Sequence, residues 1–106
     1  MSAVAILVTT VDSAENARAL ARAVLDARLA ACVQITSASS HYVWKDEVCE
    51  TQELLLQMKH RADDYAALAA LVRRLHCYET PEILRVDVAE ADPAYAAWVM
   101  ESTRRA

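Results

Sequence analysis

The N-terminal part of the chain changes from a continuous apolar run to a helical pattern of polar and apolar positions. Residues 3–10 are almost all apolar or β-branched, which is typical of a strand buried on both faces. Asp12 and Glu15 then match a capping box, with Asp12 as the N-cap, and predict a helix that continues to about Leu29. We therefore expect one buried strand followed by one amphipathic helix.

The middle of the chain has the pattern of two strands joined by a turn. Residues 31–44 are rich in β-branched and aromatic side chains, and residues 53–59 alternate between a buried and a polar side. Residues 45–47 have the composition of a turn. We expect a long β-hairpin here, with a kink or bulge at residues 37–40, where small polar side chains interrupt the strand pattern.

The C-terminal part completes a known order of elements. Helical spacing returns over residues 65–75, an apolar strand pattern follows at 83–88, and a last helix is expected from about Pro93 to Arg104. Strand, helix, strand, strand, helix, strand is the ferredoxin-like βαββαβ order. We predict a single α+β domain over residues 1–106: a ferredoxin-like sandwich with an antiparallel sheet, a long β-hairpin and an extra C-terminal helix.

The predicted hairpin is long for a domain of this size. Arms of about a dozen residues would reach roughly 40 Å at about 3.3 Å per residue, whereas the expected radius of gyration is about 13 Å. The overhanging strands would have exposed edges, which proteins commonly cover by pairing with another subunit. A homo-oligomer is therefore favoured over a monomer.

Charge and cysteine content exclude several classes of protein. With 11 basic and 15 acidic residues the chain has a formal net charge of -4, which argues against a nucleic-acid footprint and against a basic membrane-binding face. The apolar opening is too short for a membrane-spanning helix and has no basic region before it. Three widely spaced cysteines indicate neither a disulfide framework nor a CxxC zinc site, so a reducing cytoplasm is the expected location.

Catalytic motifs are not found in the sequence. Glycine is absent, which excludes glycine-rich phosphate loops, and there is no HExxH motif and no nucleophile with a base at a recognisable spacing. His76 with Glu79 or Glu82 could act as an acid-base pair, but nothing identifies a substrate. We therefore expect a binding protein rather than an enzyme.

Residues 76–82 form the densest group of chemically active side chains. His76 and Cys77 could supply an imidazole nitrogen and a thiolate to a metal ion, with an acidic side chain of the loop adding oxygen, and such a set would bind Cu(II) strongly. Cys32 joins this set if its side chain faces the same cleft; otherwise it packs in a strand as a small apolar residue. The loop could also be purely structural, with a helix-ending histidine and an exposed thiol. The metal-ligand candidates are His76, Cys77, Cys32 and Glu79, for Cu(II) or another divalent cation.

A second group of side chains could line a ligand cleft. Lys59 ends a strand and, with Glu53 and Glu82 across from it, could form a pocket for a small anion or, more simply, an ion pair. Aromatic side chains could line the same cleft, although aromatic residues at subunit interfaces more often serve packing. The cleft candidates are Trp44, Glu53, Lys59, Tyr78, Glu79, Glu82, Tyr95 and Trp98.

Four segments in a fixed order resemble the divalent-cation tolerance (CutA) family. They read ARLAACV at residues 27–33, YVW at 42–44, ELLLQMK at 53–59 and HCYETPEI at 76–83, and the resemblance covers about residues 4–98. It implies a ferredoxin-like subunit in a compact homotrimer like the PII signal proteins, a cytoplasmic location and a link to copper and other divalent cations. The family positions, of which those in the loop and hairpin are expected near an inter-subunit cleft, map onto Cys32, Trp44, Glu53, Lys59, His76, Tyr78, Glu79, Pro81, Glu82, Tyr95 and Trp98.

Three positions depart from the family pattern. The family usually has proline where this chain has Cys77, asparagine where it has Gln34 and glycine where it has Asp46. A thiol beside His76 adds a soft ligand, but the loss of proline also removes rigidity from the loop. At Asp46, any positive φ would be borne by a residue that tolerates it less well than glycine.

These observations predict a cytoplasmic homotrimeric protein that binds copper or another divalent cation and takes part in metal tolerance. The alternative is a PII-like signalling or scaffold module that binds a small metabolite or a protein partner at the inter-subunit cleft. The expected partners are further copies of the chain and divalent cations, with neither nucleic acid nor a membrane among them.

Overall fold

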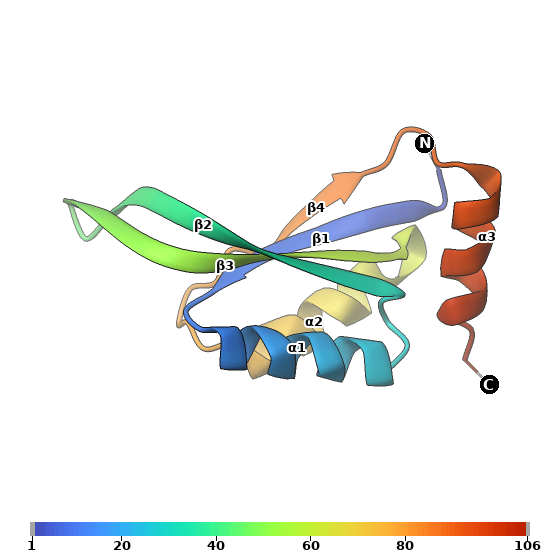
Figure 1. Ribbon diagram of the computed structural model, residues 1–106, viewed down its shortest axis with the longest axis horizontal. Coiled ribbons are helices and arrows are strands. Elements are labelled where there is room, and N and C mark those ends of the chain that lie inside the picture. Colours follow the sequence, from blue (N-terminus) through green and yellow to red (C-terminus); the bar gives the residue numbers. More distant parts are fainter. Residues whose placement is uncertain (1, 106) are drawn as a thin grey trace.

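The elements of the fold follow one another in the predicted order. The computed structural model describes residues 2–105, and Figure 1 shows a sheet with α1 and α2 on one face and α3 at one end. The predicted α+β, ferredoxin-like fold with its long hairpin and extra C-terminal helix is confirmed. The elements are β1 (Val4–Val11), α1 (Ala14–Asp26), β2 (Cys32–Trp44), β3 (Glu47–Arg61), the 3-10 turn η1 (Ala62–Asp64), α2 (Tyr65–Leu75), β4 (Leu84–Asp87) and α3 (Pro93–Ser102).

The sheet is antiparallel throughout and has the strand order β2-β3-β1-β4. Because side chains alternate between the two faces of a strand, Leu7 of β1 and Leu56 and Met58 of β3 point to the same side. There they are fully buried against Leu20 of α1 and Leu68 of α2. The core therefore lies between the two helices and one face of the sheet.

The opposite face of the sheet is covered at one end only. There α3 packs against the end of β3, where the Arg61 guanidinium donates to the carbonyl oxygen of Met100 at 2.7 Å and to the Thr103 hydroxyl at 2.8 Å. Further along this face, Leu84 and Val86 of β4 remain 54% and 48% exposed. An apolar part of the sheet thus lies open to solvent in the single chain.

The hairpin of β2 and β3 is paired without interruption from its base to its tip. Cys32 lies opposite Lys59 at the base and Trp44 opposite Glu47 at the tip, with one-to-one pairing between them. The pairing therefore contains no bulge at residues 37–40, and this part of the prediction is wrong. The ladder depends on backbone groups, and the small polar side chains of this exposed stretch leave those groups free to pair.

The turn at the hairpin tip uses two left-handed residues. Lys45 has a φ of 50° and Asp46 a φ of 65°, as a two-residue turn of the primed type requires to match the strand twist. The prediction that a residue other than glycine would carry positive φ at position 46 is confirmed. In a chain without glycine, the tip is held by the pairing of the strands beneath it.

The ends of α1 differ from the predicted ones. Ser13, not Asp12, is the N-cap, and its hydroxyl accepts from the Asn16 backbone N–H at 3.1 Å. Asp12 instead accepts from the Asn16 side-chain amide at 2.6 Å, so the predicted N-cap is one residue too early. The helix ends at Asp26 because Arg28 takes a left-handed φ of 57°, the conformation that closes many helices.

His60 is the one polar side chain of the described part of the chain that is both fully buried and left with an unpaired nitrogen. Its Nδ1 donates to the carbonyl oxygen of Arg61 at 2.6 Å, and its Nε2 has no partner within residues 2–105. Burial lowers the pKa of His60 below its ordinary value of 6.5. The neutral imidazole is therefore the form that the folded core accepts.

We expect the free energy of unfolding to decrease as the pH falls below about 6.5, because the unfolded chain then binds protons that the folded core excludes. Denaturant titrations at pH 7 and pH 5 measure this change. His60→Met should reduce the pH dependence, whereas exposed His41→Gln should leave it as in the wild type. An unchanged pH dependence in His60→Met would contradict the assignment of this pH dependence to the buried His60 imidazole.

Candidate functional site

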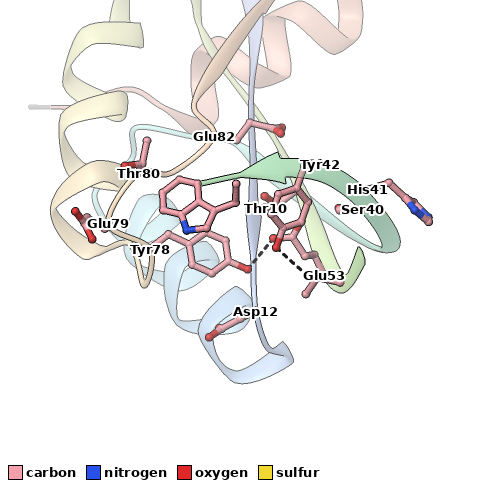
Figure 2. Close-up of a pocket in the computed structure, with 12 residues that line it drawn as sticks. Thr10, Asp12, Ser40, His41, Tyr42, Glu53, Tyr78, Glu79, Thr80 and Glu82 are labelled. Atoms are coloured by element: carbon pink, nitrogen blue, oxygen red, sulfur yellow. Dashed lines mark hydrogen bonds between the residues drawn. The ribbon is translucent and has the colours of Figure 1, made fainter. Parts of the chain in front are cut away.

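A cavity of about 650 Å³ lies between the tip half of the hairpin, the end of β1 and the loop after α2. In Figure 2, Glu53 from the hairpin faces Tyr78 from the loop, whereas the His41 side chain points away from them. The cavity brings together five of the predicted cleft residues: Trp44, Glu53, Tyr78, Glu79 and Glu82.

One hydrogen bond joins the loop to the hairpin. The Tyr78 hydroxyl donates to Glu53 Oε2 at 2.6 Å (Figure 2). Partial burial of the phenol, and then the neighbouring Glu53 carboxylate, raise the pKa of Tyr78 well above its usual range. The phenol therefore stays protonated, and its O–H donates a hydrogen bond to the Glu53 carboxylate. A hydrogen bond to a carboxylate is stronger than one between two neutral groups.

His76 is held in one tautomer by its neighbours. The backbone N–H of Tyr78 donates to Nδ1 at 3.0 Å, so the ring proton resides on Nε2, which lies 2.9 Å from the Thr9 hydroxyl oxygen. Burial lowers the pKa of His76, which favours this neutral form. Both ring nitrogens are thus engaged in hydrogen bonds that order the start of the loop.

The side chain of Cys77 lies beside Asp12 and, together with His76, lines a smaller hollow of about 230 Å³ rather than the cavity itself. Partial burial raises the pKa of Cys77, so its thiol remains protonated near neutral pH. Cys32 lies beside the Tyr95 hydroxyl at the start of β2, and partial burial of the phenol, followed by this contact, raises the pKa of Tyr95.

The predicted metal ligands do not converge within one chain. Across residues 2–105, no three His, Cys, Asp or Glu side chains come close enough together to hold a metal ion. His76 and Cys77 are neighbours at the loop, Glu79 lines the cavity, and Cys32 is at the base of the hairpin. A site built from all four would therefore need a contribution from another molecule.

Lys59, Tyr95 and Trp98 are not in the cavity. The ammonium group of Lys59 donates to Gln34 Oε1, and the predicted ion pair with Glu53 or Glu82 is not formed among residues 2–105. Lys59 is six residues from Glu53 on the same strand, which separates them by about 20 Å. Tyr95 and Trp98 pair on α3, with ring centroids 5.6 Å apart.

Sequence reasoning missed several cavity residues, and alternation could have found some of them. Ser40 and Tyr42 point to the same side of β2 as Trp44, because they are four and two residues before it. Thr10 and Asp12 enter from the end of β1, which only the strand order could reveal. The missed lining residues are Thr10, Asp12, Ser40, His41, Tyr42, Thr51 and Thr80.

Tyr78→Phe should lower the free energy of unfolding by about 1 to 2 kcal/mol, because it removes a hydrogen bond to a charged group. Tyr42→Phe is the matched control, since its hydroxyl forms a hydrogen bond with the neutral Thr51 hydroxyl at 2.9 Å, and should cost less. A double-mutant cycle with Glu53→Gln measures the Tyr78–Glu53 coupling by denaturant titration. A coupling energy near zero would contradict this assignment.

Comparison with known proteins identifies the family to which the chain is similar. The family model of the CutA1 divalent ion tolerance protein matches residues 5–102. The "Divalent-cation tolerance protein CutA" of Thermus thermophilus is 41% identical over 99 residues, which are 92% of this chain and 96% of that protein.

Solved structures agree with the sequence match. The divalent ion tolerance protein CutA1 from Ehrlichia chaffeensis superposes with a TM-score of 0.93 at 29% identity, covering 99% of both chains. The periplasmic divalent cation tolerance protein CutA from Archaeoglobus fulgidus also has a TM-score of 0.93, at 26% identity, over 95% of this chain and 99% of that one. In residues 2–105 no helix has the length and apolar character needed to cross a bilayer. The chain belongs to the CutA1 divalent ion tolerance family.

Proposed function

We propose that the protein is a cytoplasmic homotrimer that binds Cu(II) or a related divalent cation and contributes to metal tolerance by binding rather than by catalysis. Membership of a divalent ion tolerance family supports the link to metal ions. The observation that carries the proposal is the loop after α2, in which His76 and Cys77 line a small hollow and Glu79, two residues further on, lines the cavity.

The open face of the sheet supports an oligomer. On this face Leu84 of β4 lies opposite Val8 of β1, and Val86 lies opposite Ile6, so four apolar side chains form one patch. The single chain measures 44 × 26 × 22 Å, and its long axis follows the hairpin, which extends beyond the helices (Figure 1). Packing against further copies would cover both the patch and the hairpin edges.

Oligomerisation also bears on the metal ligands. Because three ligands do not converge within residues 2–105 of one chain, we infer that a neighbouring subunit completes the site. His76 and Cys77 would supply nitrogen and sulfur, Glu79 would supply oxygen, and Cys32 would come from the neighbour. Imidazole and thiolate favour copper among divalent first-row metals.

A second candidate function is supported by the size of the cavity. At about 650 Å³ it falls within the range of pockets that hold small organic molecules, and its aromatic residues Tyr42, Trp44 and Tyr78 are not metal ligands. A PII-like signalling or scaffold module that binds a metabolite or a protein segment in this cleft would use these features.

Calorimetric titration of metal-free protein with Cu(II) tests the metal proposal. His76→Ala and Cys77→Ala should each weaken binding about tenfold or more, because each removes a proposed ligand. Cys49→Ala is the matched control, since its thiol lies on the hairpin outside the cavity, and should bind as the wild type does. Unchanged Cu(II) binding in both ligand variants would remove the proposed site.

A further inference from the structure

We propose that the C-terminal end of α3 is fastened to the helix layer by a charge-dependent latch. The latch consists of the guanidinium groups of Arg28, Arg61 and Arg105 and the carboxylate of Asp64. It joins α3 to the end of α1 and the start of α2, which are far apart in the sequence. When the latch is released, the last turn of α3 and the residues after it open while the sheet and α2 stay folded.

The last turn of α3 receives hydrogen-bond donors from outside the helix. The last carbonyl groups of a helix have no partner within it, and this end carries partial negative charge. α3 has no basic residue in its own last turn, residues 99–102. Instead, Arg61 of β3 donates to the Met100 carbonyl oxygen at 2.7 Å, and Arg28 donates to that of Ser102 at 3.2 Å. Two guanidinium groups from distant segments therefore satisfy the helix end and complement its charge.

Arg105 closes the latch through a carboxylate on the helix side. Its Nη1 and Nη2 donate to the two carboxylate oxygens of Asp64 at 3.0 and 2.9 Å, the two-pronged geometry of strong Arg–carboxylate pairs. Nη1 also donates to the carbonyl oxygen of Arg28 at 2.8 Å. Because the Asp64 side chain is only 13% exposed, salt screens this pair less than it screens a pair on the open surface.

Arg28 is held by the latch from two directions. Its guanidinium donates to the end of α3, and its own carbonyl oxygen accepts from Arg105. The backbone of Arg28 has the left-handed φ of 57° that ends α1, a conformation that residues other than glycine adopt less readily. The latch therefore also stabilises the turn after α1, and its release should loosen this turn.

The latch contacts lie within one chain, at the end of the sheet opposite the hairpin tip. Figure 1 shows α3 at this end, with its last turn at the level of α1 and α2. The contacts connect the side of the sheet that carries the two helices with α3, which packs against the end of β3. None of them involves the open sheet face or the cavity, so the latch does not depend on the oligomeric state.

Hydrogen exchange of the intact protein, measured by mass spectrometry of peptides, tests the latch. Arg105→Gln should increase exchange about tenfold over residues 99–105 and at the end of α1, residues 24–31, because it removes two hydrogen bonds to a carboxylate. Exchange over residues 68–75 of α2 and over β1 should stay as in the wild type.

Arg104→Gln is the matched control, since it removes the same charge from the neighbouring residue. Arg104 pairs with Glu101 at 3.2 Å, and the two side chains are 73% and 70% exposed, so this change should leave exchange as in the wild type. Asp64→Asn should increase exchange over the same residues as Arg105→Gln does. The double variant should add little to either change, because the two side chains act as a pair.

Salt provides a test that needs no substitution. Raising the NaCl concentration from about 0.1 M to about 1 M shortens the range of charge interactions from about 10 Å to about 3 Å. Exchange of residues 99–105 should increase in the wild type, and should increase less in Arg105→Gln. Equal exchange in Arg105→Gln and Arg104→Gln would overturn the proposal. An equal increase in β1 and α2 would also overturn it, because the whole domain would then open rather than the end of α3.

Discussion

The continuous pairing of β2 with β3 is the constraint on which the rest of the structure depends. From Cys32 opposite Lys59 to Trp44 opposite Glu47, the fixed register decides which side chains face the core and which face the cavity. It also carries the hairpin beyond the helices (Figure 1), where no core supports it. The same feature therefore builds one wall of the cleft and creates the exposed strand edges that call for further subunits.

The loop after α2 joins this hairpin through a small number of specific contacts. A protonated Tyr78 donates to Glu53, and a neutral His76 lies between the Tyr78 backbone and Thr9. These bonds order the loop, and two of them occupy the ring nitrogens of His76, which the sequence marks as a metal ligand. Metal binding through His76 would have to break at least one of them, whereas an organic ligand in the cavity would leave them intact.

Local features of the fold could be predicted because they depend on neighbours in the sequence. The alternation of β3 and the helical spacing of α2 predicted these elements correctly. The N-cap of α1 was placed one residue early, because Asp12 and Ser13 are both favourable N-cap residues and only the backbone geometry decides which of them caps the helix. The Tyr78–Glu53 contact spans 25 residues and depends on strand register. The separation of Lys59 from Glu53, by contrast, follows from the predicted strand over residues 53–59 alone, because six residues of a strand span about 20 Å.

We propose that further copies of the chain complete its open sheet face and its hairpin and thereby assemble the site. Native mass spectrometry, supported by light scattering in solution, measures this directly. We expect a particle with three times the 11.7 kDa mass of one chain, and Val86→Glu, which places a charge on the exposed apolar face, should shift it toward the monomer. A wild-type mass of 11.7 kDa at micromolar concentration would contradict the account.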